Sequence, residues 1–436
     1  MKDSFQNIFK IPELRKRIFI TLALLAVYRV GTHVPTPGID GIALKEFFER
    51  AQGTMLGFFD MFAGGALSRL SVFALGIMPY ISAAIILELL TVVVPYLDKL
   101  KKEGEQGHKK ITQYTRYGTV LLCAIQSFGI SVGLERMTSP AGALIVPSPG
   151  WDFRLMTMIT LTAGTTFIMW LGEQITERGI GNGISLIIFA GIVANMPAAI
   201  ANTLRLVRTG DMQPLLVLVL IAMMVVVVGV IVFMESGHRK IPIQYAKRIV
   251  GRRMYGGQST YLPLKVNTSG VIPPIFASSI IMFPATVASF AGIAWMQTIS
   301  NSLRPGYLIY TVISAGLIFF FCYFYTAIIF NPDDTADNMK KYGGFVPGIR
   351  PGRKTAEFID KTLTRLTFAG AIYLCFIVIL PDYMVRYLNV PFYFGGTGLL
   401  IVVGVAMDTM SQIESHLVMR HYEGFMKKGR IKSRRG

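Results

Sequence analysis

The chain has 436 residues, of which 52% are hydrophobic and 16% are charged, and its formal net charge is +18. The apolar residues come in blocks close to the roughly 20 residues that cross a bilayer, which excludes a soluble globular fold. The basic residues flank these blocks, a pattern that favours anionic lipids and cytoplasmic partners over free nucleic acid and leaves open a contact with RNA on a large partner.

The N-terminal apolar segment is predicted to be the first membrane helix, near residues 18–34. Basic residues Arg15 to Arg17 precede an 11-residue apolar run, Ile18 to Tyr28, as in a secretory signal peptide. The run is followed by Arg29 and the string VGTHVPTPG, without a small-x-small cleavage site. We therefore interpret it as a helix that is retained.

The next segment, Gly57 to Leu70, is apolar but too short to span a bilayer. It contains Asp60, Arg69 and a glycine pair, and it leads directly into the second predicted crossing. Irregular backbone at membrane depth is tolerated only inside protein or beside a water-filled cavity. The sequence leaves two interpretations equally open: an external amphipathic loop, or a re-entrant element.

Ten membrane helices are predicted in all, with both termini in the cytoplasm. Thirty-three of the 43 Lys and Arg residues then lie on the cytoplasmic side, which fixes the orientation by the positive-inside rule. The predicted helices lie near residues 18–34, 72–92, 117–135, 155–172, 183–204, 214–234, 269–291, 307–330, 366–384 and 396–414.

The ten helices divide into two sets of five, so the second set enters the membrane from the opposite side. This is the arrangement of an inverted-topology repeat, in which a site lies at the interface of the halves. We expect an N-terminal half over residues 1–204, a hinge loop over 205–213 and a C-terminal half over 214–436. The fold class expected from these spans is therefore an all-α membrane protein of ten transmembrane helices in two inverted five-helix halves.

Signs of catalysis are missing, so we expect no enzyme, no cofactor and no metal. The sequence has no phosphate-binding loop, no HExxH and no nucleophile elbow. The glycines of GIGNG, Gly179 to Gly183, have the wrong spacing for a dinucleotide site and indicate either close helix packing or a flexible helix start. The cysteines lie inside apolar blocks and are interpreted as buried thiols, and the scattered histidines have no metal-binding spacing: Cys123, Cys322, Cys375, His33, His108, His238, His416 and His421.

An ion-coupled secondary transporter with inverted repeats is the alternative to a channel. It would need carboxylates inside the membrane, where a charge costs at least about 2.5 kcal/mol. Glu88 and Asp408 are the candidates, and both lie toward the cytoplasmic ends of predicted helices. The scarcity of such groups argues against the transporter.

Two long cytoplasmic loops, residues 235–265 and 331–365, carry seven basic residues each. The second contains VPGIRPG, whose prolines and glycines favour a fixed turn over a flexible tether. Attraction to lipid explains the charge but not the interleaved aromatic, Pro and Gly positions. We interpret both loops as docking platforms for a large cytoplasmic partner.

Several long strings resemble the bacterial SecY family, the channel subunits of the Sec protein translocon. The resemblance runs through nearly all ten predicted helices and both loops, in the strings MFAGGALSRLSVFALGIMPYISA, KKEGEQGHKKITQYTRYGT, MWLGEQITERGIGNGIS, GRRMYGGQST, IPPIFASSI, FNPDDTADNMKKYGGFVPGIRPG and VPFYFGGTGLLIVV. It implies a channel that moves unfolded secretory polypeptides across the plasma membrane and releases hydrophobic segments sideways into lipid. The hinge would lie between the fifth and sixth helices.

The resemblance also assigns roles to particular residues. A plug that closes the resting channel corresponds to residues 55–70, including Asp60, Phe62, Gly64, Gly65 and Arg69. A constriction of apolar side chains, which resists wetting, corresponds to Ile77, Ile81, Ile184, Ile188, Ile275 and Ile401. A lateral gate corresponds to segments that carry Ser82, Gln126, Asn182 and Phe283.

The partners implied by the resemblance are the membrane subunits SecE and SecG, the ATPase SecA, the translating ribosome, and unfolded preproteins with their signal sequences. Anionic lipids are expected as well. Docking residues would include Arg252, Arg253, Arg350 and Tyr422. The implied location is the bacterial inner membrane.

Overall fold

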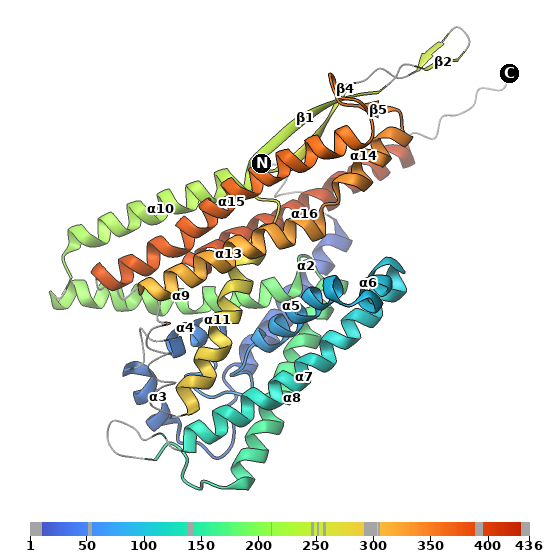
Figure 1. Ribbon diagram of the computed structural model, residues 1–436. Helices are drawn as coiled ribbons and strands as arrows, with labels where there is room; N and C mark the ends of the chain where they lie inside the picture. The colour runs from blue at the N-terminus through green and yellow to red at the C-terminus, as the bar shows by residue number, and fades with distance from the viewer. Residues whose placement is uncertain are drawn as a thin grey trace. The chain divides into compact units, whose positions relative to one another are not determined.

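The computed structural model describes residues 11–50, 55–135, 137, 144–210, 212–245, 248–250, 253–255, 259–291, 303, 306–388 and 396–428 (Figure 1). The chain falls into two compact units. Unit 1 comprises Met1–Arg205, Met282–Arg304 and Ile401–Gly436, and unit 2 comprises Leu206–Ile281 and Pro305–Leu400.

Unit 1 is built from helices, and its longest pair, α7 and α8, pack along each other. An ion pair joins them: Arg154 Nη2 lies 2.6 Å from Glu135 Oε2, and Glu135 Oε1 also accepts from the backbone N–H of Gly150. The helices are α2 (Pro12–Gly31), α3 (Gly41–Arg50), α4 (Met55–Phe62), α5 (Met78–Val93), α6 (Pro95–Lys102), α7 (Glu105–Glu135), α8 (Trp151–Arg178), α9 (Gly183–Thr209) and most of α16 (Gly396–Lys428).

Proline explains the sharpest bend in unit 1. Helices α5 and α6 meet at an angle of 100° at Val94, whose backbone is extended. A residue before proline is disfavoured in the helical conformation, and Pro95 has no N–H to continue the helical ladder, so the first helix ends there. Pro95 then suits the first turn of α6, where the missing donor costs nothing.

Unit 2 combines apolar helices with a small sheet. Asn331 caps the short helix α14 by accepting hydrogen bonds from the backbone N–H groups of Asp333 and Asp334. The elements are α10 (Pro214–Ser236), β1 (His238–Tyr245), β2 (Arg248–Val250), β3 (Arg253–Tyr255), β4 (Ser259–Lys265), α11 (Ile272–Ala291, whose last residues belong to unit 1), α13 (Leu308–Ile329), α14 (Pro332–Lys341), β5 (Gly344–Phe345) and α15 (Arg353–Leu388).

The three-stranded sheet has the order β4-β1-β5 and is antiparallel, with Ile241 opposite Leu262 and Gln244 opposite Phe345. Alternate residues of β1 face inward, as the period of a strand requires. They form an apolar core with α14 and α15, made of Ile241, Ile243, Leu264, Met339, Val346, Ile359 and Leu363. The two predicted cytoplasmic loops therefore fold together into one small module, at one end of the helices of unit 2 (Figure 1).

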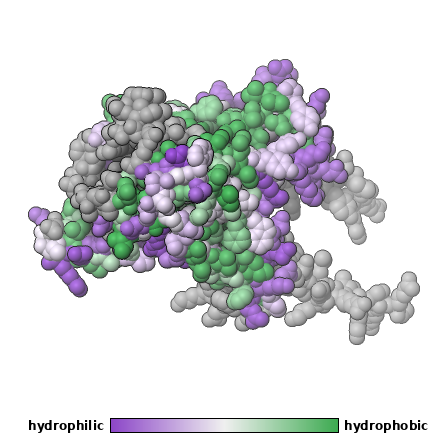
Figure 2. Space-filling model, turned by 90° about the horizontal axis from the view of Figure 1, so that it is seen from below, coloured by the Kyte–Doolittle hydropathy of each residue, from purple (hydrophilic) through white to green (hydrophobic). Residues whose placement is uncertain are grey.

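Within the described residues, seven helices are long and apolar enough to cross a membrane, or eight if the bent pair α5 and α6 is one span. Apolar side chains cover wide areas of the surface (Figure 2), and α10 buries only Val227 and Ile231. A helix that is apolar all round without being buried in protein belongs in lipid. The fold is thus that of a mainly helical membrane protein with several spans, as predicted, and the count of ten crossings stays a prediction.

Every predicted span overlaps a helix, but several boundaries differ: α5 begins at Met78 and not at residue 72, and α16 continues to Lys428, beyond the predicted end at residue 414. Helix α7 begins at Glu105 and α15 at Arg353, each about three turns before the predicted apolar span, because hydropathy ends at charged residues and helical structure does not. Helix α9 continues to Thr209, inside the segment predicted as a hinge loop. The strands in the cytoplasmic loops were not predicted.

Candidate functional site

The segment of residues 55–70 is packed inside unit 1. Phe59, Phe62, Ala66 and Leu67 are all buried, whereas Arg69 is exposed and Asp60 is partly buried. An external amphipathic loop would expose one face along its length. The structure therefore supports the interpretation of this segment as an element enclosed by protein.

A glycine pair turns the chain at the end of helix α4. Gly64 and Gly65 have φ of +69° and +79°, a region that L side chains rarely adopt. A Cβ on Gly64 would lie 3.0 Å from the Cα of Gly191 on α9, so the close approach of the two backbones also requires glycine. Within the turn, Asp60 Oδ1 accepts a hydrogen bond of 2.8 Å from the backbone N–H of Ser68.

Two side chains of α2 donate hydrogen bonds to two backbone carbonyls of this turn. The hydroxyl of Tyr28 donates to the carbonyl of Ala63 at 3.4 Å, and Nη1 of Arg29 donates to the carbonyl of Gly64 at 2.9 Å. The ring of Tyr28 stacks on that of Phe73, with 6.0 Å between centroids. Irregular backbone away from water needs such partners.

The connection from this segment to α5, residues 71–77, is fixed between α2 and α8. A Cβ on Gly31 would lie 2.0 Å from Cε2 of Phe73, and a Cβ on Gly164 would lie 1.9 Å from the carbonyl oxygen of Val72. The N–H of Val72 donates to the carbonyl of Val34 at 2.9 Å. Residues 71–77 are thus an anchor. Segment 55–70, which precedes this anchor, is a short helix followed by a turn.

The six predicted constriction residues lie on four helices or at their ends. Ile77 and Ile81 lie at the start of α5, Ile184 and Ile188 at the start of α9, and Ile401 on α16 in unit 1, while Ile275 lies on α11 in unit 2. Ile184 is half-buried and the other five are buried. A Cβ on Gly172 would lie 3.2 Å from Cγ1 of Ile184, so part of this side chain packs on α8.

The predicted lateral-gate residues are spread over four elements. Ser82 on α5 and Gln126 on α7 belong to helices that pack against each other. Gln126 is buried, and its side-chain carbonyl oxygen has no hydrogen-bond partner among the described residues. Asn182 caps α9 by accepting from the N–H groups of Ile184 and Ser185. The backbone of Phe283 lies on α11, and its side chain is outside the described residues.

The GIGNG turn between α8 and α9 is a close-packed junction, which agrees with the first of the two interpretations of its glycines. A Cβ on Gly183 would lie 1.9 Å from the carbonyl oxygen of Gly172. The N–H of Gly181 donates to Oε1 of Gln412 on α16 at 2.9 Å, and the N–H of Ile180 donates to Oγ1 of Thr21 on α2 at 3.0 Å. This junction holds α2, α9 and α16 together inside unit 1.

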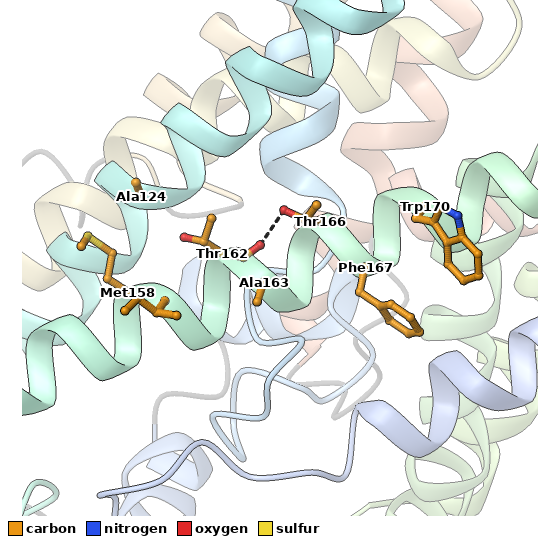
Figure 3. A pocket seen from close by; sticks show the side chains of 8 residues that line it. Ala124, Met158, Thr162, Ala163, Thr166, Phe167 and Trp170 are labelled. Carbon is orange, nitrogen blue, oxygen red and sulfur yellow. Dashed lines mark hydrogen bonds between the residues drawn. The ribbon is translucent and has the colours of Figure 1, made fainter.

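An open, mainly apolar groove of about 780 Å³ runs along α8 and reaches Ala124 on α7 (Figure 3). Of its two hydroxyls, Thr166 Oγ1 donates to the carbonyl of Thr162 at 2.8 Å, whereas Oγ1 of Thr162 is buried and has no hydrogen-bond partner among the described residues. The remaining lining residues are Met158, Ile159, Ala163, Phe167 and Trp170. A groove of this mainly apolar composition suits a hydrocarbon neighbour.

The predicted docking residues differ in how far the structure describes them. Arg350 is exposed in the VPGIRPG turn, which Gly348 and Gly352 shape with φ of +82° and +97°. Its carbonyl accepts a hydrogen bond of 2.9 Å from Oγ1 of Thr355, so the turn is fixed to the start of α15. Arg252 lies outside the described residues, as do the side chains of Arg253 in β3 and Tyr422 in α16.

Acidic side chains do not form a candidate ion site in the described part of the chain. No group of three or more His, Cys, Asp or Glu residues there could hold a metal. Glu88 is partly exposed, and its carboxylate lies 4.0 Å from Nζ of Lys101. Asp408 is exposed. Asp382 on α15 is a buried carboxyl that sequence reasoning missed.

Sequence reasoning also missed the residues that surround segment 55–70, namely Tyr28, Arg29, Gly31, Gly164 and Gly191. Their partners are 35 or more positions away in the chain, so no local periodicity could reveal them. The only signal in the sequence was the presence of glycines inside apolar helices, which suggests a close backbone approach without saying to what.

Comparisons with known proteins agree on one family. The model of the family described as SecY matches residues 71–410. The chain is 54% identical to protein translocase subunit SecY of Escherichia coli strain K12, over 97% of this chain and 96% of that protein.

Two solved structures share the fold, each over 98% of both chains. One is described as showing that the plug domain of the SecY protein stabilises the closed state of the translocation channel and maintains a membrane seal; its TM-score is 0.63 at 18% identity. The other is Sec61 in the canine ribosome-channel complex from the endoplasmic reticulum, with a TM-score of 0.60 at 16% identity.

Proposed function

The chain belongs to the SecY family, and from this premise we propose that it is the channel-forming subunit through which unfolded secretory polypeptides cross the bacterial inner membrane. The observation that carries the proposal is the 54% identity to a protein translocase subunit over nearly the whole of both chains. Family membership also removes the reason to prefer an ion-coupled transporter. The orientation, with both termini in the cytoplasm, follows from the distribution of basic residues.

Segment 55–70 is the proposed plug of the resting channel. Its support is its enclosure in unit 1 by α2 and α9, and the existence of a plug domain in a protein of the same fold. Segment 55–70 has internal hydrogen bonds: the N–H of Ser68 donates to Asp60, and Oγ of Ser68 donates to the carbonyl of Gly65. We propose that the body of the segment moves together, and that it joins the fixed part of the chain where the N–H groups of Ser71 and Thr36 donate to the carbonyls of Ala66 and Leu70.

The apolar constriction is proposed to consist of Ile77, Ile81, Ile184, Ile188, Ile275 and Ile401. Apolar side chains around a narrow passage resist wetting, so that ions are held back while a polypeptide passes. Ile184 is the one half-buried member of the proposed ring, and part of its side chain packs on α8. The ring is proposed from the resemblance, and the burial of five members agrees with a closed state.

A lateral exit for hydrophobic segments is proposed between α5 with α7 on one side and α11 with α13 on the other. A signal sequence of ten leucine-like residues gains about 5 kcal/mol on entering lipid, at about 0.5 kcal/mol per residue. Ser82, Gln126, Asn182 and Phe283 would line the seam. A buried amide oxygen without a partner, as in Gln126, costs about 1–3 kcal/mol and would be relieved on opening.

The basic module of β1, β4, α14 and the start of α15 is the proposed dock for cytoplasmic partners. The chain has no nucleotide-binding motif of its own, so we propose that energy comes from the ATPase SecA, from the translating ribosome and from the proton-motive force. Exposed Arg350 on a fixed turn suits such a contact, and Arg252, Arg253 and Tyr422 are proposed to join it. SecE and SecG are the proposed membrane subunits, and anionic lipids would neutralise the remaining charge.

The test is protection of a preprotein from protease. Proteoliposomes containing the purified chain with SecE, SecG and SecA should take up a labelled preprotein on addition of ATP, and vesicles lacking only this chain should not. Equal protection in both vesicle preparations would overturn the proposal. Transport of a small solute without any preprotein uptake would favour the transporter.

A further inference from the structure

The hydrogen bonds from α2 to segment 55–70 differ in kind from the other contacts of that segment. The bonds between Asp60, Ser68 and Gly65 lie within the segment and would move with it. Those from Tyr28 and Arg29 join it to a helix outside it. At its end, the segment also accepts backbone hydrogen bonds from outside, from the N–H of Ser71 to the carbonyl of Ala66 and from the N–H of Thr36 to the carbonyl of Leu70. The bonds from Tyr28 and Arg29 are side-chain bonds that hold the glycine turn to another helix.

The geometry of the glycine turn makes this pair possible. The left-handed conformation of Gly64 and Gly65 ends α4 and turns the carbonyls of Ala63 and Gly64 away from any helical ladder. The absence of a Cβ on Gly64 lets the turn lie against Gly191 on α9. These two carbonyls then face the last turn of α2. There the buried hydroxyl of Tyr28 and the half-buried guanidinium of Arg29 are the donors.

We propose that Tyr28 and Arg29 form a latch that holds segment 55–70 in its resting position. The inference rests on the proposed plug function of that segment and adds which residues control its release. Apolar contacts weaken gradually as surfaces separate, whereas these directed bonds are lost over a displacement of about 1 Å. Loss would also leave the buried hydroxyl of Tyr28 without a partner, which makes the released state costly and the resting state the default.

The anchor next to the segment keeps the donors in place. The ring of Tyr28 stacks on Phe73, which lies in the fixed connection and itself stacks on Phe167 of α8 at 6.0 Å. Tyr28 therefore stays in position when segment 55–70 moves, and its hydroxyl remains available for return. The same hydrogen bond can therefore form again when the segment returns.

The experiment measures release directly by the accessibility of a buried cysteine. Ala66 is fully buried in the segment, so Ala66→Cys should react slowly with a membrane-impermeant maleimide in a background lacking the three native cysteines. Tyr28→Phe removes one oxygen and keeps the stacked ring, and Arg29→Gln removes the charged donor. Tyr117→Phe, at an exposed tyrosine bonded to Gln113, is the matched control.

We expect each latch variant to label Cys at position 66 about tenfold faster than the parent, and the double variant faster still, with no change for Tyr117→Phe. A tenfold change corresponds to about 1.4 kcal/mol. An unchanged labelling rate of the cysteine at position 66 in Tyr28→Phe would overturn the latch. If the melting temperature of that variant fell as well, the hydrogen bond of Tyr28 would contribute to stability alone. If Arg29→Gln fails to fold, Tyr28→Phe alone decides.

Preprotein uptake by the cysteine-free parent, measured in the same vesicles, separates the two proposals. Uptake by the parent with unchanged labelling in the variants would refute the latch and leave the channel function standing. Faster labelling in the variants with no uptake by the parent would refute the channel function and support the latch as a property of the fold.

Discussion

At the scale of single residues, glycine is the residue type on which the position of the plug segment depends. Gly31 and Gly164 allow a ring or backbone to approach more closely than a Cβ would permit, and Gly64 and Gly191 allow an approach that a Cβ would make very tight. Polar contacts such as Arg29 with Gly64 then form because the carbonyls are brought within reach.

Substitution of Gly164 by alanine should destabilise unit 1. The added Cβ would lie 1.9 Å from the carbonyl oxygen of Val72, so the anchor must shift, at an expected cost of about 1–3 kcal/mol. Thermal unfolding in detergent measures it. Gly129→Ala on α7, where an added Cβ meets nothing within 4 Å, is the control and should be neutral or stabilising. Equal behaviour of the two variants would contradict the close packing.

Polar substitution in the proposed constriction should relax selectivity for signal sequences. Ile81→Asn or Ile401→Asn weakens the apolar contacts that favour the closed state, and a loss of about 1.4 kcal/mol raises a rare open population tenfold. The readout is export of a preprotein with a defective signal sequence. Ile86→Asn, at an exposed position of the same helix, is the control. No gain at either ring position would show that these isoleucines only pack.

At the scale of elements, the sequence predicted the positions of the apolar helices well. It predicted the ends of several helices poorly and did not predict the strands. The all-apolar block of α10 predicts the helix to within a few residues, because only a membrane span has that composition. The extensions of α7 and α15 could not be predicted from hydropathy, since pairs such as Lys109 with Glu105 support helix where the apolar pattern has ended.

The strands were missed because their pairing depends on segments that are distant in the chain. β1 pairs with β5 about a hundred residues later, after three intervening helices among the described residues. The buried residues of β1, Ile241 and Ile243, do alternate with exposed ones, but the run is short and contains Pro242. Such a pattern is too weak to separate a strand from a loop.

Charge reversal of Arg350 should abolish export and leave the protein inserted in the membrane. The side chain is exposed on a fixed turn, so Arg350→Glu should change partner docking with little effect on folding. Uptake driven by SecA in proteoliposomes measures the effect. Lys361→Glu, an exposed basic position on α15, controls for net charge. Normal uptake by Arg350→Glu would exclude this turn as the dock.

A disulfide across the proposed lateral gate should stop transport reversibly. Cysteines at Ser82 and Phe283 can join only if their Cα atoms come within about 7 Å, as expected for a closed or slightly open seam. The three native cysteines, all buried, are replaced first. Oxidation should then block uptake and reduction should restore it. Full cross-linking with undiminished uptake would show that α5 and α11 do not separate.

At the scale of the whole molecule, the chain divides into two compact units, and three of the divisions fall inside described helices. The divisions fall between Arg205 and Leu206 in α9, between Ile281 and Met282 in α11, and between Leu400 and Ile401 in α16. The predicted halves, 1–204 and 214–436 with a hinge at 205–213, remain a prediction about how the chain moves. Hydropathy can suggest such halves because each must enter and leave a bilayer, but it contains no information on packing between helices.

The most direct test of the channel is to ask which residues touch a polypeptide in transit. A photoreactive amino acid at Ile81, Ile188 or Ile401 should cross-link to a preprotein arrested during transport, because the constriction surrounds the passing chain. The same group at Val226, an exposed apolar position on α10, should react with lipid and not with the preprotein. Cross-links from Val226 as strong as those from the three isoleucines, or none from any of the three while transport proceeds, would contradict passage through this chain.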